Sequence, residues 1–114
     1  MSGIEIVRSN NRDGWTVDED PPGEIPSLWR ELEVFSSGKG AFTTGLWERE
    51  PDTWAFERPY DEVGVILSGS ADIETEDGQR LSVGPGDVFV TPKGTKGVWH
   101  IHETVVKFFA IYDA

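Results

Sequence analysis

The sequence predicts an all-β protein, folded as a β-sandwich or small barrel, from three observations. Residues 61–69 form a short apolar run that follows a proline and ends at a serine–glycine pair, which is typical of a buried strand. Residues 88–91 form a second apolar run between a Gly-Pro-Gly-Asp turn and a proline. Asp77-Gly78 is a strong hairpin signal between two further strands. We therefore expect roughly nine or ten short strands and almost no helix, as in a jelly roll.

The N-terminal residues 1–39 are expected to be a strand-and-loop segment that packs on the domain formed by residues 40–114. Residues 4–7 have the apolar pattern of a first strand. Residues 17–26 carry several acids and three prolines, which predicts a loop. Residues 27–32 are expected to form a helical turn with a serine N-cap. One structural domain should result, because a chain of 114 residues has enough apolar surface for one core.

The remaining strands are predicted from alternating apolar residues bounded by turns. They span residues 32–35, 41–48, 61–67, 71–75, 79–83, 88–91, 96–102 and 105–112. The segment 49–58 joins two of these strands and is expected to be a loop, although it carries Trp54 and Phe56. These rings either close the mouth of the barrel or anchor the loop by hydrophobic contact.

Composition excludes several functions. The chain has no cysteine, so a disulfide framework, a thiolate nucleophile and a cysteine zinc cluster are excluded. The net charge of -11 argues against nucleic acid as a partner, because its phosphates would be repelled. No apolar run approaches a membrane span, and the start lacks a basic-then-apolar signal. We expect a soluble cytoplasmic protein that does not contact a membrane.

Two short motifs resemble those of the cupin superfamily. Glu62 is followed after six residues by Gly69, which is the spacing at the end of the first cupin motif. Gly86, Pro92 and Gly94 match the spacing of the second motif. Further details resemble the small single-domain cupins grouped with ureidoglycine aminohydrolase: Gly45–Glu48, Tyr60–Glu62, Gly97–Trp99 and Val106–Lys107. The resemblance covers roughly residues 40–112 and implies a cupin jelly roll, a fold that hosts many functions.

The resemblance also identifies the positions at which most metal-binding cupins carry their three histidines and one glutamate. Here these positions hold Phe56, Arg58, Glu62 and Gly97. Three of the four ligands are missing, and a cation stands in place of one histidine, so the usual imidazole and carboxylate set cannot form. The altered set of one glutamate and two histidines used by aminohydrolase members is absent as well. We expect no metal and no other cofactor.

The only two histidines, His100 and His102, are two residues apart, which places both on one face of a strand. The motif match directs residue 97 inward, and Trp99 and Ile101 with it, so both histidines should point outward. A slip of one residue or a bulge would reverse this orientation. A non-standard metal site at this pair or at Glu57 therefore stays an open alternative.

Strand phase also predicts which side chains face a cavity. If Glu62 points inward, Tyr60, Gly64 and Ile66 share its face. The outer face is then wholly apolar and must be covered by the N-terminal strand or by a second subunit; it consists of Val63, Val65 and Leu67. We expect a homodimer built by sheet packing.

Lys107 interrupts an apolar strand. A lysine in such surroundings either reaches solvent, for example at the rim of a dimer, or is paired with a carboxylate. If it faces the cavity, Glu62 is its natural partner, and removal from water could leave the amine partly neutral and nucleophilic. Both readings stay open at this stage.

The predicted cavity suits a small polar or cationic metabolite such as an amine, a ureide or a sugar, because aromatic faces and a carboxylate both attract positive charge. Glu62 and Lys107 are the candidate catalytic residues, and the candidate binding residues are Trp47, Arg58, Tyr60 and Trp99. The first hypothesis is a metal-independent binding protein. The second is an enzyme acting on C–N bonds or on carbohydrate with Glu62 as acid/base, and the third is a structural dimer without a ligand.

Overall fold

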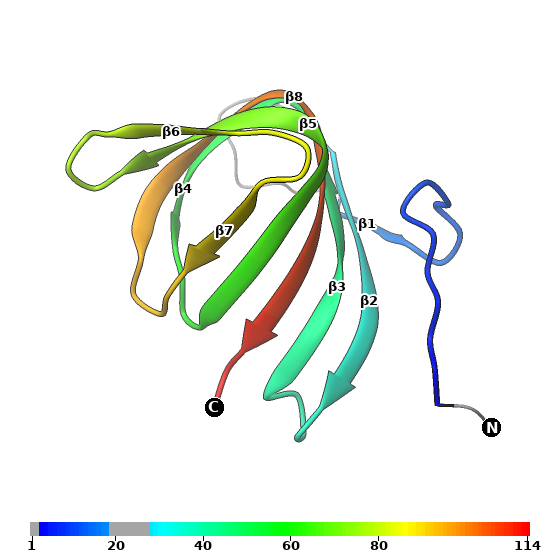
Figure 1. Cartoon of the computed structure of the whole chain (residues 1–114). Helices are drawn as coiled ribbons and strands as arrows, with labels where there is room; N and C mark the ends of the chain where they lie inside the picture. The colour runs from blue at the N-terminus through cyan, green and yellow to red at the C-terminus, as the bar shows by residue number, and fades with distance from the viewer. Residues whose placement is uncertain (1–2, 19–27) are drawn as a thin grey trace.

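The computed structural model describes residues 3–18 and 28–114, and within them the chain forms eight strands and no helix (Figure 1). The strands are β1 Thr16–Asp18, β2 Trp29–Ser37, β3 Phe42–Arg49, β4 Asp52–Glu57, β5 Asp61–Thr75, β6 Arg80–Val83, β7 Val88–Thr91 and β8 Lys96–Tyr112. The antiparallel sheet has the order β1-β2-β3-β8-β5-β6, with β4 paired to β8 and β7 paired to β5. The all-β jelly-roll class is confirmed.

The strand count is lower than expected because two predicted breaks do not end a strand. β5 continues through Gly69, and β8 continues through Glu103 and Thr104. The register between β5 and β8 shifts at three places between Ile66 and Ala71, and Gly69 has a positive φ of 89°, so the pair bends there without separating. The first half of β8 pairs with β4, the second half pairs with β3, and β5 pairs with both halves. These two long strands therefore hold the two ends of the sheet together.

Two predictions about the N-terminal region were wrong. Residues 4–7 form no strand, and Ile4 and Ile6 are largely exposed; a short apolar pattern is not by itself enough to form a strand. Residues 29–32 are not helical but open β2, which pairs along the whole length of β3; cross-strand pairing overrides a weak helix signal. Ser27 and residues 19–26 of the expected loop lie outside the described residues, whereas Val17 and Asp18 belong to β1.

The N-terminal segment is tied to the barrel by charge. Arg12 Nη2 lies 2.9 Å from Glu48 Oε2, and Arg30 Nη1 lies 3.0 Å from the other oxygen of the same carboxylate. The two guanidinium groups hold the pKa of Glu48 below its ordinary value, although partial burial acts in the opposite direction. Glu48 thus connects the segment before β1 to β2 and β3.

The segment 49–58 is a strand over most of its length and not the loop that we expected. Residues 52–57 form β4, in which Trp54 lies opposite Trp99 and Phe56 lies opposite Gly97 on β8. A buried ion pair between Arg49 and Asp52 spans the tight connection from β3. The aromatic residues that looked out of place in a loop are therefore wall residues of the barrel.

The core is an aromatic cluster centred on Trp99, which is 1% exposed. Its ring centroid lies 5.5 Å from Phe89, 6.2 Å from Trp54 and 6.5 Å from Trp47, distances at which aromatic rings attract one another. Gly64 makes room for this cluster, because a Cβ there would lie 2.2 Å from the Phe89 ring. The cluster forms the floor of the cavity described below.

Candidate functional site

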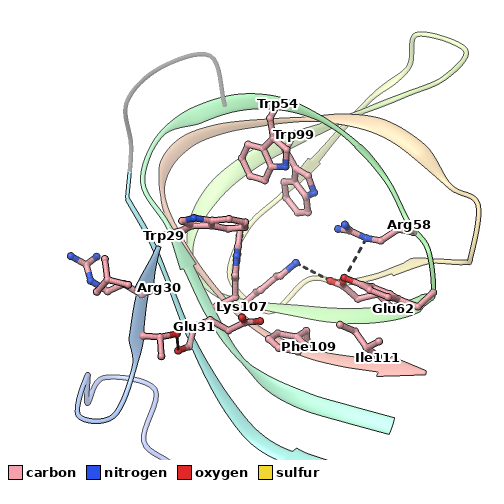
Figure 2. Close-up of a pocket in the computed structure, with 14 residues that line it drawn as sticks. Trp29, Arg30, Glu31, Trp54, Arg58, Glu62, Trp99, Lys107, Phe109 and Ile111 are labelled. Carbon is pink, nitrogen blue, oxygen red and sulfur yellow. Dashed lines mark hydrogen bonds and ion pairs between the residues drawn. The ribbon is translucent and has the colours of Figure 1, made fainter. Parts of the chain in front are cut away.

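A cavity of about 630 Å³ opens inside the curved sheet (Figure 2). Its walls combine four indole rings, from Trp29, Trp47, Trp54 and Trp99, with the charged groups of Glu31, Arg58, Glu62 and Lys107. Arg30 also borders the cavity, but its guanidinium group points away from it and pairs with Glu48 (Figure 2). The rest of the lining is Thr16, Val17, Tyr60, Phe109 and Ile111. An apolar pocket with a few converging polar groups is the usual form of a small-molecule site.

The predicted orientation of β5 is confirmed. Glu62 and Ile66 are buried on the inner side, and the exposed side chains of Val63 and Leu67 alternate with them on the outer side. Alternation of side chains along a strand produces this pattern once one residue is directed inward. Glu62 therefore enters the cavity from the beginning of β5.

Lys107 faces the cavity, which resolves the alternative that the sequence left open. Its Nζ lies 2.8 Å from Oε2 of Glu62, and the exposed fractions of the two side chains are 7% and 3%. Lys107 is brought to Glu62 by the pairing of β8 with β5, across 45 residues of sequence. The result is a buried ion pair on the cavity wall.

The surroundings of Lys107 disfavour its charged form. Removal from water lowers the pKa of the ammonium group, the neighbouring Glu62 raises it, and Arg58 lowers it again, with a net shift below the ordinary value. The rings of Trp47, Trp99 and Phe89 lie 4.5, 5.4 and 5.5 Å from Nζ. These ring faces replace part of the lost hydration. The charged form of Lys107 is thus less favoured than that of an exposed lysine.

Arg58 enters the cavity from the connection between β4 and β5. Its backbone exchanges hydrogen bonds with the turn before β8, because its N–H donates to Thr95 and its carbonyl accepts from Gly94. Its Nε donates to Thr91 Oγ1 at 3.1 Å and lies 3.5 Å from Glu62 Oε1. The guanidinium carbon also lies 4.5 Å from the centre of the Phe56 ring. These contacts hold the Arg58 side chain in one orientation.

All six residues singled out from the sequence line the cavity; they are Trp47, Arg58, Tyr60, Glu62, Trp99 and Lys107. Tyr60 is half-buried, and burial together with the Glu62 carboxylate raises the pKa of its phenol. A neutral hydroxyl that can donate a hydrogen bond is therefore maintained at neutral pH. The roles of the six residues in binding or catalysis remain predictions.

Eight of the fourteen lining residues were not among the six singled out, and four of these eight come from segments 27–32 and 49–58, which were not predicted as strands. Trp29, Arg30 and Glu31 were assigned to a helical turn, and Trp54 was assigned to a loop, but all four lie on strands and line the cavity. Trp29 and Glu31 are two residues apart, which was the available sign of a shared strand face. Partial burial raises the pKa of Glu31, while Lys107 lowers it less strongly. A second carboxylate thus borders the site.

The histidines lie outside the cavity, as the strand phase predicted. His100 Nε2 is 2.9 Å from Glu74, and His102 Nε2 is 3.2 Å from Asp72. Glu57 is exposed and lies 4.0 Å from Lys96. Across residues 3–18 and 28–114, no three His, Cys, Asp or Glu side chains come together as a metal site. These residues therefore give no support to the non-standard metal site.

The cavity is also poorly suited to the metal that many cupins hold. Glu62 is the one retained ligand position, and the cationic groups of Arg58 and Lys107 lie 3.5 and 2.8 Å from its oxygens. The permanent charge of Arg58, together with that of Lys107 whenever it is protonated, repels a metal ion at this distance. The donor set does not fit a transition metal, and no step of the chemistry is derived through one.

Comparison with known proteins identifies the family. The chain belongs to the EutQ-like cupin domain family, whose model matches residues 36–109. No curated protein matches the sequence significantly. Among the residues that the structure describes, there is no helix of the length and apolarity needed to cross a membrane.

Solved structures share the fold at low sequence identity. The EutQ protein of Clostridium difficile is 21% identical, with a TM-score of 0.67 over 77% of this chain and 70% of that chain. A putative ethanolamine utilization protein Q from Salmonella typhimurium LT2 is 20% identical, with a TM-score of 0.69 over 81% and 75%. A Pseudomonas syringae pv. tomato protein of unknown function from the DUF861 family is 22% identical, with a TM-score of 0.77 over 85% and 43%. These similarities establish the cupin fold alone.

Proposed function

We propose that this cupin is a metal-independent, cytoplasmic protein that binds a small polar metabolite in the aromatic cavity. The observation that carries the proposal is the buried pair of Glu62 and Lys107, whose Oε2 and Nζ lie 2.8 Å apart on the wall of a 630 Å³ cavity. A buried ion pair is costly to build, and here it offers a donor and an acceptor to a ligand held between indole faces. Such a combination supplies both stacking and hydrogen bonding.

The charges of the cavity narrow the ligand class. Arg58 and Lys107 are opposed by one buried carboxylate, Glu62, so a simple cation is a poor fit. We therefore favour a ureide, a sugar or a zwitterionic amine over a plain amine. One observation supports the proposed relationship with ureidoglycine aminohydrolase-like cupins. The segments of this chain that resemble those cupins contribute five residues to the cavity lining: Trp47, Tyr60, Glu62, Trp99 and Lys107.

The test is a ligand screen on the purified protein by ligand-observed NMR, with ureides, sugars, amino acids and plain amines. Binding is expected for at least one polar class and should be lost in Lys107→Met. The control is Lys96→Met, since Lys96 lies on the same strand, is exposed and does not line the cavity. Elemental analysis should find far less than one metal ion per chain. A stoichiometric metal that is lost on Glu62→Ala would contradict the proposal. A screen in which no ligand binds would also contradict it, and would favour a purely structural dimer.

A second candidate is an enzyme that acts on C–N bonds or on carbohydrate. It is favoured by the proximity of Glu62 to a lysine whose pKa is lowered by burial, because a proton can then pass between carboxylate and amine during a reaction. NMR time courses with each ligand from the screen separate the candidates. Slow disappearance of a ligand that stops in Glu62→Gln, while binding persists, would identify an enzyme. Unchanged ligand signals over many hours would leave binding as the function.

A further inference from the structure

The guanidinium group of Arg58 is only partly satisfied by the protein. Its Nε donates to Thr91 and faces Glu62, but within the described part of the chain neither terminal nitrogen has a hydrogen-bond partner at the distances that define one. The side chain is 12% exposed, and neither terminal nitrogen is among the fully buried atoms without a partner in the described residues, so both retain accessible surface. Figure 2 shows the guanidinium group reaching into the cavity beside the carboxylate of Glu62. Two forked N–H groups are therefore available to a ligand.

The charge balance points to the kind of group that would occupy this position. Arg58 and Lys107 both approach Glu62, at 3.5 and 2.8 Å, so two cationic side chains share one buried carboxylate. Glu31 also borders the cavity, but its side chain is exposed, so solvent screens its charge more strongly than that of the buried Glu62. A buried excess of positive charge is costly unless an anion neutralises it. One monovalent anion completes the balance.

We infer that Arg58 binds the carboxylate of the cavity's ligand through its two terminal nitrogens, so that the natural ligand is a small carboxylic acid anion whose remainder lies against the indole rings. This inference rests on the proposed binding function and specifies its ligand class. A planar guanidinium group binds a planar carboxylate through two parallel hydrogen bonds. A phosphate dianion fits less well, because the one excess positive charge balances only one of its two negative charges. The second negative charge would lie close to the carboxylate of Glu62 and be repelled by it.

The rigid setting of Arg58 supports a binding role. The backbone is fixed by hydrogen bonds to Gly94 and Thr95 at 2.8 and 2.9 Å, and the guanidinium plane rests on Phe56. The exposed arginine Arg80 provides a contrast, since its terminal nitrogens pair loosely with Asp72 and Glu74 at 3.8 and 3.5 Å. A side chain that is already ordered loses little entropy when it binds a ligand.

The test compares matched acids and amides. Benzoate and propionate are titrated by ligand-observed NMR at neutral pH against benzamide and propionamide, which have nearly the same shape without the charge. We expect each carboxylate to bind at least about ten-fold more tightly than its amide, a difference of about 1.4 kcal/mol. Phenyl phosphate is the third probe and should bind more weakly than benzoate.

Variants assign the preference to Arg58. Arg58→Gln should bring the ratio of acid to amide affinity to about one, and Arg58→Lys, which retains charge but not the fork, should give an intermediate ratio. Arg80→Gln is the matched control and should leave the ratio unchanged, because Arg80 does not line the cavity. Circular dichroism and melting curves verify that each variant is folded. If a variant fails to fold, the comparison of acids with amides on the wild-type protein still tests the inference.

Each other outcome overturns the inference. Equal binding of acid and amide by the wild type, stronger binding of phenyl phosphate, or an acid preference that persists in Arg58→Gln would exclude a carboxylate site at Arg58. If no carboxylate binds but a ureide or sugar does, the inference fails while the proposed binding function stands. Failure of every probe and of every member of the screen would remove both.

Discussion

At the scale of single residues, the cavity is governed by the buried pair of Glu62 and Lys107. Each side chain is at most 7% exposed, so removal of Glu62 leaves the charge of Lys107 with little water and, among the described residues, no other carboxylate within ion-pair distance. Removal of Lys107 is expected to cost less, because Arg58 still lies 3.5 Å from Glu62. The aromatic rings around Nζ reduce this cost but do not remove it. The pair is therefore structural and functional at once, and the two contributions must be separated by measurement.

We predict that Glu62→Gln lowers the free energy of unfolding by about 3 kcal/mol near neutral pH. The double variant Glu62→Gln/Lys107→Met should recover about half of this loss, because both charges are then removed. Glu57→Gln is the control, since Glu57 is exposed, and should change little. Urea denaturation of the wild type, Glu62→Gln, Lys107→Met and the double variant measures the cycle, with Glu57→Gln denatured in parallel. An additive double variant would show that the two groups are not coupled.

The same pair predicts a pH dependence. Burial lowers the pKa of Lys107 in the folded chain below its ordinary value of 10.5, so the unfolded chain binds more protons between the lowered pKa and 10.5. The contribution of this group to stability therefore rises with pH in that window. We expect the loss in free energy of unfolding caused by Glu62→Gln to become smaller as pH is raised from 7 towards 9. A penalty that is constant or grows with pH would show that Lys107 stays charged.

At the scale of elements, the bend in β5 and β8 shapes the barrel. Gly69 lies at the register shift with a φ of +89°, and a Cβ at this residue would lie 2.1 Å from the carbonyl oxygen of Thr104 on β8. The turn glycine Gly78 has nearly the same φ, +88°, but nothing lies within 4 Å of its Cβ position. The two glycines differ in surrounding space and share the same backbone conformation.

This contrast gives a paired prediction. Gly78→Ala should cost about 1 kcal/mol of stability, which is the strain of a left-handed conformation, whereas Gly69→Ala should cost about 3 kcal/mol or more, because the backbones of β5 and β8 must also separate. Thermal or urea denaturation measures both values. Equal losses in the two variants would show that the contact with Thr104 does not constrain the bend.

At the scale of the whole molecule, the apolar outer face remains partly uncovered. Val7 and Ser9 of the N-terminal segment border a groove on this face with Leu67 and Phe108, so the segment covers one part of it. Val63 pairs with Val90, and Val65 with Val88, across β5 and β7. The exposed fractions of Val63, Val88 and Val90 are 41%, 63% and 62%. Such a contiguous apolar patch is typical of an interface.

We propose that this valine patch joins two copies of the chain into a homodimer. Light scattering at micromolar concentration should give twice the 12.7 kDa of one chain. Val90→Glu should yield a folded monomer, because it buries a charge at the interface. Leu81→Glu is the control, since Leu81 is 50% exposed and lies on β6, away from the patch. A monomeric wild type, or a dimer that survives Val90→Glu, would place the interface elsewhere or exclude it.

The sequence alone determined the fold class and the inner face of β5, because turn residues and two-residue alternation act over a few neighbouring positions. It therefore directed Glu62 inward and both histidines outward, and it identified six cavity residues. It did not show that residues 29–32 and 52–57 are strands, since their pairing with β3 and β8 outweighs a weak local signal.

Only the tertiary structure decided how the charges meet. Lys107 and Glu62 are 45 residues apart, and Arg58 joins them through contacts with the turn before β8. The direction of Lys107 depends on the register of β8 against β3 and β5, which includes three shifts that no local pattern predicts. The excess positive charge, and with it the inferred carboxylate ligand, therefore follows from the register of strands that are far apart in sequence. Register is a property of paired strands and cannot be read from the sequence of one strand alone.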